Sequence, residues 1–383
     1  MIYVMGEAMA RGFSYGAPGW VNLGQGAPET GDLPGANPRI DTIQLDARDH
    51  EYSPVSGLAD LREAVAALYN HRYRRGLASQ YTAENVAISS GGRAGLTRVV
   101  AALGQIHLGH FLPDYTAYEE LLGSFQSFLP IPVVLRRDHG FYLPVAELRR
   151  EVIGRGLGAL LVSNPCNPTG NLVRGAELEA WAAMGRETGC WLIFDEFYAH
   201  YLYGEAARAA SHSASAYVVD VNKDPVVILD GLTKNWRYPG WRLSWTLGPK
   251  SVIERLASAG SFLDGGPPHP LQRAALPLLE PDVADREARA IQQAFGDKRL
   301  QTITRLKAMG MEILREPEGA FYVFAGLDRL PPSLQDGMAL FKAALEAKVI
   351  VVPGAFFDVN PGKRRSHIPS RLKGFVRVSY GPA

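Results

Sequence analysis

Residues 227–245 read VILDGLTKNWRYPGWRLSW and place a lysine just after an apolar run. The run ends at Asp230, Lys234 follows four residues later, and Arg242 lies beyond a Pro-Gly step that leads into a second apolar run. Lysine is rarely buried without a partner, so a solvated loop residue is the ordinary interpretation of Lys234. A functional interpretation of Lys234 requires other reactive or binding groups beside it. The ends of the neighbouring predicted strands are the segments that could supply them.

Short apolar runs alternate with helical patterns around this stretch. The helical patterns include GRAGLTRVVAALG and GAELEAWAAMGRETG, and the apolar runs are NVAISS, IHLGHFL, IPVVLR, GALLVSN, CWLIFDE, PVVILDG and WRLSWTL. Strands that are apolar throughout and interleaved with helices are typical of a mostly parallel sheet with helices on both faces. We therefore predict an α/β fold whose large domain contains such a sheet and spans residues 46–265.

Two regions flank the predicted large domain. Residues 1–45 are rich in glycine and proline and are expected to form an extended arm and part of a small domain. The last third begins with a helical pattern over 282–310 and continues with MEILREP, GAFYVFAG, the helical GMALFKAALEAKV and a closing strand in GFVRVSY. This order predicts a small C-terminal α+β domain over residues 266–383.

Composition argues against several classes of protein. The 383 residues carry a formal net charge of +1 without a long basic run, which disfavours nucleic acid and membrane surfaces as partners. Two cysteines, Cys166 and Cys190, cannot form a disulfide framework, and no cysteine or histidine spacing indicates a metal site. The N-terminus lacks a signal-peptide pattern, and no apolar stretch reaches the roughly 18 residues of a membrane span. We therefore expect a cytoplasmic protein.

The residues after each apolar run are the first candidates for a site, because ligands of open α/β sheets lie beyond the carboxyl ends of the strands. SGGRAGL follows the first run, and the free amides of Gly92, Arg93 and Ala94 at a helix start are suited to a phosphate. PDYTAY follows the next run and presents Tyr115, whose ring is available for stacking.

Later strand ends add amide and carboxylate groups. NPCNPTG is a rigid turn of two X-Pro steps and a glycine, and it holds Asn164 and Asn167. DEFY places Asp195 and Glu196 at the end of a buried strand, where a carboxylate needs a charged or hydrogen-bonding partner. The opening stretch then adds its lysine and its arginine.

Together these groups match one cofactor. A ligand with a phosphate, a flat basic ring, a phenolic oxygen and an aldehyde would engage all of them. Pyridoxal 5′-phosphate carries these four groups, a lysine forms its Schiff base, and an acidic side chain pairs with its ring nitrogen. Lys234 is therefore predicted to hold the aldehyde of this cofactor.

The motifs also resemble those of a known family. The chain contains, in order, NLGQGAPE, EYSPVSGLADLREAVA, SGGRAGL, PDYTAY, NPCNPTG, DEFY, GLTKNWRYPGWRLSW, PEGAFYVF, VVPGAFF and FVRVSY. In this order they resemble the fold-type I, class I/II pyridoxal-phosphate-dependent aminotransferases over nearly the whole chain. The resemblance implies that an amino group moves from an amino acid to a 2-oxo acid by a ping-pong mechanism, in a homodimer with shared active sites.

The resemblance assigns roles around the cofactor ring. It implies that Lys234 carries the cofactor and moves protons, and that Asp195 pairs with the ring nitrogen. Tyr198 and Asn167 would contact the phenolic oxygen, and Tyr115 would stack on the ring. By the same resemblance, Lys234, Asp195 and Tyr198 are the catalytic residues.

The resemblance also implies a phosphate site and a substrate site. The phosphate would be held by Gly92, Arg93, Ala94, Thr233 and Arg242, joined by Tyr52 of a second subunit. Arg377 would bind the α-carboxylate of the substrate through two hydrogen bonds, with Gly26 and Asn167 close to it.

Three features depart from the family pattern. Gly231 stands where many relatives have a phosphate-binding serine, so phosphate affinity would depend more on Arg242 and Thr233. DGGPPHP, residues 264–270, replaces a Ser/Thr/Asn-rich segment, and its His269 is either structural or reaches the neighbouring site. No second arginine is evident for a distal carboxylate, so a dicarboxylic substrate is not favoured.

Other functions use the same kind of site. The cofactor supplies the electron sink and the pocket selects the bond that breaks, so a lyase, or a cyclase acting on a modified amino acid, is the alternative. The unusual 264–270 segment is the feature that favours it. A cofactor-sensing domain of a transcriptional regulator is not favoured, because the sequence shows no spare segment for a helix-turn-helix module.

Overall fold

The computed structural model describes residues 2–124 and 128–382. Its α-helices are α1 Ile2–Ala10, α2 Ala59–Tyr73, α3 Gly92–Leu103, α4 Ala117–Ser124, α5 Val145–Arg155, α6 Ala176–Thr188, α7 Leu232–Asn235, α8 Lys250–Leu263, α9 His269–Ala275, α10 Pro281–Ala308 and α11 Gly337–Glu346. Its strands are β1 Val21–Asn22, β2 Val86–Ser89, β3 Ile106–Leu112, β4 Phe128–Val134, β5 Ala159–Ser163, β6 Trp191–Asp195, β7 Val226–Gly231, β8 Ser244–Leu247, β9 Tyr322–Gly326, β10 Val349–Ile350, β11 Val352–Pro353 and β12 Phe375–Ser379.

The large sheet has the strand order β2-β8-β7-β6-β5-β3-β4. β8 is antiparallel to both of its neighbours, whereas the pairs from β7 to β4 are parallel. The parallel strands therefore present their carboxyl ends at one edge, where Asp195 and Gly231 end β6 and β7. This edge carries the motifs that the sequence singled out.

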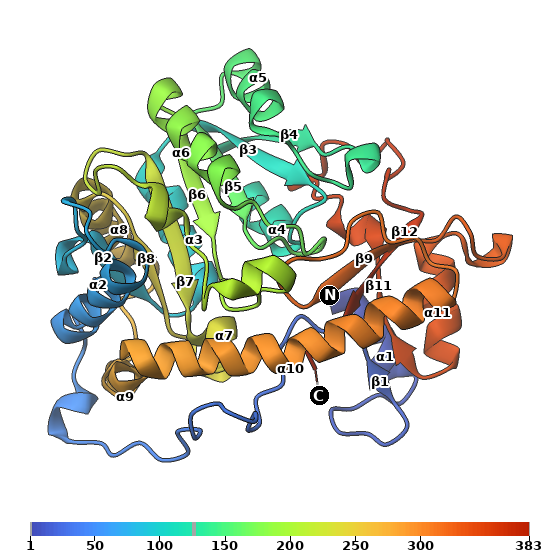
Figure 1. The fold of residues 1–383 in the computed structure, drawn as a ribbon, viewed down its shortest axis with the longest axis horizontal. Coiled ribbons are helices and arrows are strands. Elements are labelled where there is room, and N and C mark those ends of the chain that lie inside the picture. The colour runs from blue at the N-terminus through green and yellow to red at the C-terminus, as the bar shows by residue number, and fades with distance from the viewer. Residues whose placement is uncertain (1, 125–127, 383) are drawn as a thin grey trace.

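Helices cover both faces of the large sheet (Figure 1). In β5, Leu160 and Val162 pack in the hydrophobic cluster that includes α2, α5 and α6, whereas Ala159 and Leu161 pack in the cluster of α3, α4 and α8. Every residue of β5 is buried, as expected for a central strand between two helical layers. The predicted α/β fold with a mostly parallel sheet is confirmed.

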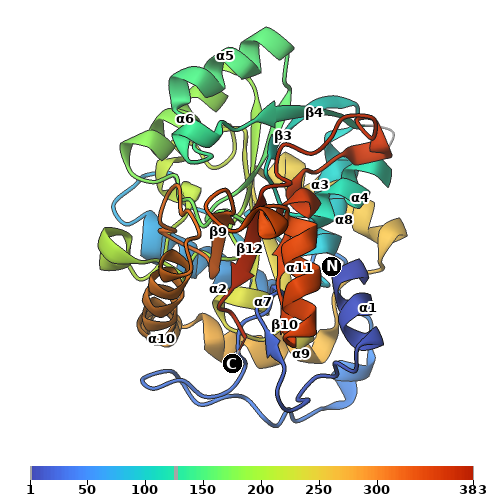
Figure 2. The ribbon, with the colours of Figure 1, turned by 90° about the vertical axis from the view of Figure 1, so that its right-hand side faces the viewer.

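A second group of strands lies beside the large sheet. β11, β12 and β9 form an antiparallel sheet, and β1 pairs in parallel with β10, which joins the N-terminal segment to the last third of the chain. Figures 1 and 2 show α1 and α11 side by side near these strands. α10 contacts both α2 and β9 and so connects the two regions. The domain boundaries at residues 45 and 265 stay a prediction.

The N-terminal segment differs from the extended arm predicted for residues 1–45. Residues 2–10 form α1, which buries Val4 and Ala8, four positions apart. Tyr3 of this helix packs against Phe341 of α11, with ring centroids 6.3 Å apart. The prediction of an extended arm is wrong here, because tertiary packing of one helical face outweighs the unfavourable helix propensity of Gly6.

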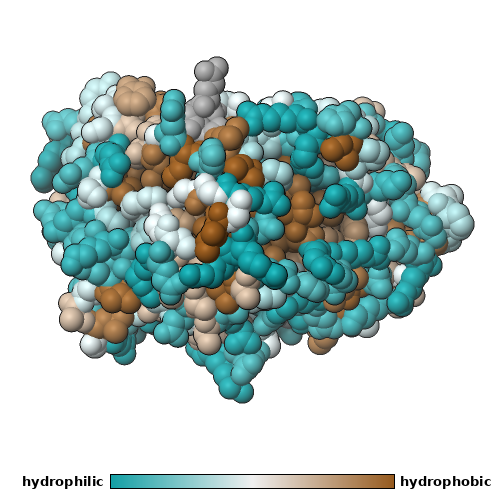
Figure 3. Space-filling model, turned by 90° about the horizontal axis from the view of Figure 1, so that it is seen from above, coloured by the Kyte–Doolittle hydropathy of each residue, from teal (hydrophilic) through white to brown (hydrophobic). Residues whose placement is uncertain are grey.

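The face of the molecule in Figure 3 is mainly hydrophilic, with apolar residues in small groups between polar ones. Isolated apolar side chains of this kind are ordinary on a folded protein. Among the described residues, none of the helices combines the length and the apolarity that crossing a membrane requires.

Candidate active site

Lys234 lies on α7, the short helix that begins where β7 ends. Tyr201 donates a hydrogen bond to the Lys234 carbonyl oxygen at 2.9 Å, and the Asn235 side chain donates to Asp230 at 2.6 Å. The Lys234 Nζ atom donates to the carbonyl oxygen of Gly26 at 2.5 Å. The side chain is therefore turned into the protein, and the interpretation as a solvated loop residue is wrong.

Burial and neighbouring charge favour the neutral amine of Lys234. Removal from water disfavours the ammonium form, and the guanidinium groups of Arg242, Arg377 and Arg93 act in the same direction. Together they lower the pKa of Lys234 from 10.5 to about 7, against the opposing charge of Asp195. A lysine with a pKa near neutrality is suited to act as a nucleophile and as a base.

Asp195 ends β6, the strand next to β7. Its Oδ2 accepts a hydrogen bond from the Tyr118 hydroxyl at 2.6 Å, while its Oδ1 has only a long contact, 3.5 Å, with the Phe197 amide. Burial raises the pKa of Asp195, and the Tyr118 hydrogen bond opposes this rise. Glu196 has different partners: its Oε1 accepts from the Ala214 amide at 2.7 Å, and burial raises its pKa to about 8.

Arg377, on β12, is buried against the turn that follows β5. Its Nη1 donates to the Asn167 side-chain oxygen at 2.8 Å, and its Nη2 donates to the Gly24 carbonyl oxygen at 2.7 Å. The guanidinium lies over the ring of Tyr322 at 4.3 Å, and the Tyr322 hydroxyl is 2.7 Å from that of Tyr198. The structure thus brings Arg377, Asn167 and Tyr198 together.

Asn164, the other asparagine of the NPCNPTG turn, has a structural role. Its side-chain nitrogen donates to the Val173 carbonyl oxygen at 2.9 Å, and its side-chain oxygen accepts from the Val173 amide at 2.9 Å. These two bonds close the turn and leave Asn167 as the asparagine that faces Arg377.

The start of α3 forms the predicted phosphate side of the site. Its first backbone bond joins the Gly95 amide to the Gly91 carbonyl at 3.2 Å, so the amides of residues 92–94 have no partner within the helix. The Arg242 guanidinium lies so close to Gly91 that a Cβ atom there would overlap it. These amides and this guanidinium are suited to a phosphate.

The two aromatic residues predicted to contact the cofactor have different surroundings. The Tyr115 hydroxyl accepts from the Arg93 guanidinium at 3.3 Å, and its ring packs edge-on against Tyr118 with centroids 5.4 Å apart. Tyr52 is 96% exposed. Tyr115 therefore belongs to the site within one chain, whereas Tyr52 is presented to the outside.

Gly231 stands where the backbone of β8 passes close to the end of β7. A Cβ atom at this position would lie 2.5 Å from Ser244 Cα and 2.6 Å from the Leu243 carbonyl oxygen. The serine of many relatives does not fit here unless β8 moves. Thr233 is then the nearby hydroxyl that this turn offers to a phosphate.

The 264–270 segment is anchored to α3 and to the loop before α2. Arg98 donates to both carboxylate oxygens of Asp264, at 3.0 and 2.5 Å. Gln272, just after the segment, donates to the Pro267 and Pro268 carbonyl oxygens at 3.3 Å and to the Ser53 hydroxyl at 2.9 Å, and so ties the segment to the loop before α2. These contacts give the segment a structural role. The Nδ1 of His269 is buried without a partner among the described residues.

The residues fit the cofactor that the sequence predicts. Thr233 Oγ1 and Arg377 Nε are buried without a hydrogen-bond partner among the described residues, which is unusual for polar atoms. Within the described part of the chain, Asp195 Oδ1 has only one long contact, 3.5 Å from the Phe197 amide, and no short hydrogen bond. A phosphate, a carboxylate and a protonated ring nitrogen would satisfy these three positions.

Two buried tyrosines belong to this site although the sequence patterns did not single them out. Tyr118 donates to Asp195, and Tyr322 contacts both Tyr198 and Arg377. The sequence does contain an indication for Tyr118. It follows Tyr115 by three residues in PDYTAYEE, about one helical turn, which would place the two rings on the same side. Tyr322 lies in an apolar strand, where an aromatic residue ordinarily belongs to the core.

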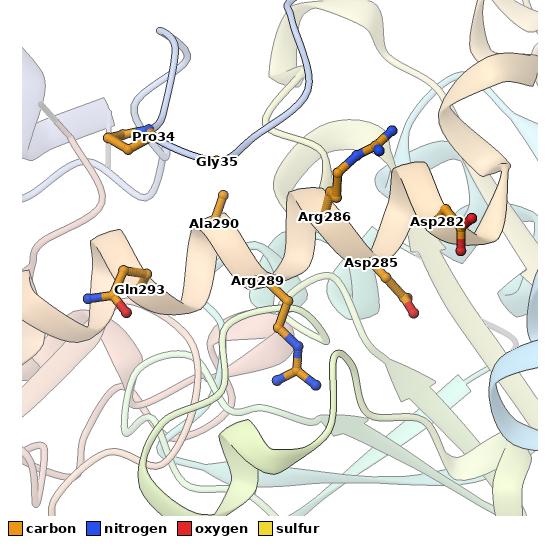
Figure 4. Close-up of a pocket in the computed structure, with 8 residues that line it drawn as sticks. All are labelled: Pro34, Gly35, Asp282, Asp285, Arg286, Arg289, Ala290 and Gln293. Atoms are coloured by element: carbon orange, nitrogen blue, oxygen red, sulfur yellow. The ribbon is translucent and has the colours of Figure 1, made fainter.

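A shallow groove of about 550 Å³ lies on α10 (Figure 4). It is lined by Pro34, Gly35, Asp282, Asp285, Arg286, Arg289, Ala290 and Gln293. Some of its charges are already engaged: Asp285 pairs with Arg72 at 2.7 Å, and Arg289 donates to the Ala207 carbonyl at 2.6 Å. None of its lining residues belongs to the candidate site.

Comparison with known proteins agrees with the motifs and with the fold. A family profile described as aminotransferase class I and II matches residues 18–383. An aspartate aminotransferase of Streptomyces avermitilis is 30% identical over 343 residues, which cover 86% of this chain and 77% of that protein. The aspartate/prephenate aminotransferase of Thermus thermophilus is 30% identical over 339 residues, 86% of this chain and 83% of that one.

A solved structure has the same fold. The aspartate aminotransferase from Thermus thermophilus with maleate superposes with a TM-score of 0.80 at 26% identity, over 100% of this chain and 92% of that one. The profile match extends over nearly the whole chain and includes the lysine, the strand-end motifs and the closing strand. The resemblance inferred from the motifs is confirmed: this chain is an aminotransferase of the class I and II family.

Proposed function

We propose that this aminotransferase binds pyridoxal 5′-phosphate through Lys234 and moves an amino group from an amino acid to a 2-oxo acid in two half-reactions. The observation that best supports it is the inward-facing Lys234 amine, whose pKa is lowered to about 7 by burial and by three arginines. An ordinary lysine is almost fully protonated at neutral pH and is a poor nucleophile, whereas much of this one is neutral.

Residues around Lys234 hold the ring of the cofactor. Asp195 accepts a hydrogen bond from the ring nitrogen and favours its protonated form. Tyr198 and Asn167 contact the phenolic oxygen, and Tyr115 packs on the ring. The bound cofactor supplies an electron sink for the substrate. The Lys234 Nζ atom would take the proton from the substrate Cα, hold it, and give it back, so that Lys234 acts first as a base and then as an acid.

Two positively charged regions bind the anionic groups. The helix-start amides of residues 92–94, with Arg242 and Thr233, hold the phosphate, because free amides and the helix dipole favour an anion. Arg377 binds the α-carboxylate of the substrate through charge-assisted hydrogen bonds, with Asn167 and Gly26 beside it. The substrates are thus an amino acid and a 2-oxo acid, both small molecules.

A homodimer with shared active sites completes the proposal. Tyr52 is 96% exposed, and Arg93 and Arg242, on the phosphate side, are exposed as well. A second copy covering this side would bring its own Tyr52 to the phosphate and exclude water from the charges. The location that we propose, following the sequence, is the cytoplasm.

A single half-reaction tests this function. With an amino acid and no 2-oxo acid, each site should turn over once, and the visible absorbance of the bound cofactor should fall and return when a 2-oxo acid is added. A lyase or a cyclase regenerates the cofactor in every cycle and would form product without an acceptor. Sustained product formation of this kind would replace the proposed reaction by the alternative. A protein that takes up no cofactor would reject the proposal altogether.

A further inference from the structure

Tyr322 is a fully buried residue of β9 that touches both the substrate side and the cofactor side of the candidate site. In the register of the small sheet, Arg377 lies opposite Phe324. Tyr322 is two residues before Phe324, so its side chain is on the same face of the sheet as that of Arg377. The strand pairing therefore puts the two side chains at diagonal positions on one face of the sheet.

The ring of Tyr322 forms one side of a stack around Arg377. The guanidinium carbon is 4.3 Å from the centroid of the Tyr322 ring and 4.8 Å from that of Phe357. Hydrogen bonds to Asn167 and Gly24 fix the direction of the guanidinium within this stack. The aromatic faces attract the cation and keep the plane of the guanidinium in place.

The hydroxyl of Tyr322 has a different partner. It lies 2.7 Å from the Tyr198 hydroxyl, and the two rings meet edge-on with centroids 5.5 Å apart. A Cβ atom at Gly26 would lie 2.8 Å from the same hydroxyl oxygen. The hydroxyl therefore lies between Tyr198 and the glycine whose carbonyl accepts the hydrogen bond from Lys234.

We propose that Tyr322 is a positioning residue with two separable roles: its ring orients Arg377 for the substrate carboxylate, and its hydroxyl orients Tyr198 for the phenolic oxygen of the cofactor. The inference rests on the proposed function, because both target groups belong to it. It extends that function by assigning recognition of the substrate and tuning of the cofactor to different atoms of one side chain.

The role of the Tyr198 hydroxyl decides which of the two tyrosines donates the hydrogen bond between them. The 2.7 Å distance suits a donor on either side. Once the Tyr198 hydroxyl donates its proton to the phenolic oxygen, it can only accept from Tyr322, so Tyr322 would be the donor in the loaded enzyme. Burial raises the pKa of Tyr322 to about 12, which keeps its phenol protonated as a donor at neutral pH. A hydrogen bond received by Tyr198 polarises its own O–H group and strengthens the bond that it donates.

Two substitutions separate the roles. Tyr322→Phe removes the hydroxyl and keeps the ring, whereas Tyr322→Leu removes both. Tyr203→Phe is the matched control, because Tyr203 is also buried and its hydroxyl donates to the Ala320 carbonyl at 2.6 Å. Each holoenzyme is measured for its dissociation constant for pyridoxal 5′-phosphate, the pH at which its visible absorbance changes, and its KM for an amino acid.

We expect Tyr322→Phe to weaken cofactor binding about 2- to 12-fold, the range for one neutral hydrogen bond. The pH transition of the absorbance should rise by about 0.3 to 1 unit, because the phenolic oxygen receives a weaker hydrogen bond. The KM should change less than about twofold. Tyr322→Leu should in addition raise the KM about 2- to 30-fold through the lost cation–π contact.

A further substitution checks that the hydroxyl acts through Tyr198. In a Tyr198→Phe background, Tyr322→Phe should have no further effect on cofactor binding, because the partner hydroxyl is absent. This cycle and the Phe variant alone decide the hydroxyl role even if Tyr322→Leu does not fold.

Two results would overturn the inference. In one, Tyr322→Phe behaves like Tyr203→Phe in both cofactor binding and pH transition. In the other, Tyr322→Phe raises the KM as strongly as Tyr322→Leu. Wild-type protein that takes up no cofactor would instead reject the proposed function. A wild-type enzyme that transaminates, with an unaffected Tyr322→Phe variant, would reject the hydroxyl role of Tyr322 and leave the proposed function intact.

Discussion

The candidate site has an inner side and an outer side that are built differently. The inner side consists of enclosed side chains with hydrogen bonds inside the chain: Asp195, Asn167, Tyr198 and Arg377. The outer side consists of side chains exposed to solvent: Arg93 and Arg242 of this chain, joined in the proposed dimer by Tyr52 of the second copy. Lys234 lies between them, since its pKa responds to charges of both sides.

The difference indicates which part of the site one chain completes by itself. Enclosed polar groups must find partners in the folded chain, so the inner side is oriented before a ligand arrives. The exposed groups of the outer side are still free to move, and their charges act through water, which weakens them. We therefore expect inner-side substitutions to change chemistry and substrate recognition, and outer-side substitutions to change cofactor affinity in a way that depends on assembly.

Replacing Lys234 should have the largest effect. Lys234→Ala removes both the nucleophile that holds the cofactor and the base that moves the proton, so kcat should fall about 10⁴-fold or more. Cofactor binding should persist more weakly through Arg242 and Asp195. The measurements are steady-state kinetics and the absorbance of the bound cofactor.

A covalent label provides the control for this assignment. Borohydride reduction of the wild-type holoenzyme should attach the cofactor to the peptide that contains Lys234. Lys250→Ala is the matched variant, because Lys250 pairs with Glu84 at the surface and should leave activity unchanged. Recovery of the label on Lys250 or Lys223 would contradict the role of Lys234.

The lowered pKa of Lys234 also predicts a pH dependence of stability. The folded chain loses the Lys234 proton near pH 7, and the unfolded chain loses it near the ordinary value of 10.5. Between these values the unfolded chain binds more protons, so this group makes the free energy of unfolding of cofactor-free protein rise with pH from about 7 to 10.5. Lys234→Met should flatten that part of the profile in denaturant titrations. Parallel profiles for the two proteins would show that Lys234 is protonated when folded.

Arg377 should give the next largest effect, and the effect should be on the substrate. Arg377→Ala leaves the substrate carboxylate without its partner, a loss of about 2–5 kcal/mol, which raises the KM for amino acids by tens to thousands of fold. The cofactor should still bind, because the phosphate side of the site is intact. Arg186→Ala is the control, because Arg186 pairs with Asp224 away from the site at 3.0 Å. An Arg377→Ala enzyme that loses the cofactor but keeps its KM would show that Arg377 binds the cofactor and not the substrate carboxylate.

The sequence predicts much of the site because the rule for strand ends is geometric. Parallel strands end at one edge, so polar residues after apolar runs must meet, and Asp195 and Lys234 do so. This rule does not predict Tyr118 and Tyr322. Each lies inside a helix or a strand, where a buried aromatic residue is ordinarily assigned to the hydrophobic core. The helix α1 is not predicted either, because it is stabilised by packing on α11, a contact that no local sequence pattern shows. The features that the sequence did not predict are thus those that depend on tertiary contacts between distant segments.

Tyr52 should give the smallest effect, and one that depends on assembly. Tyr52→Ala removes one hydrogen bond to a charged phosphate at an exposed position, so cofactor affinity should fall about tenfold while kcat at saturating cofactor changes little. Because the lost group belongs to the partner's site, mixing Tyr52→Ala with Lys234→Ala chains should rebuild one intact site in each hybrid dimer. Random pairing restores about a quarter of the sites, so activity at limiting cofactor should exceed the sum of the two separate proteins. Activity equal to that sum, or full activity in diluted monomers, would show that each chain completes its outer side alone.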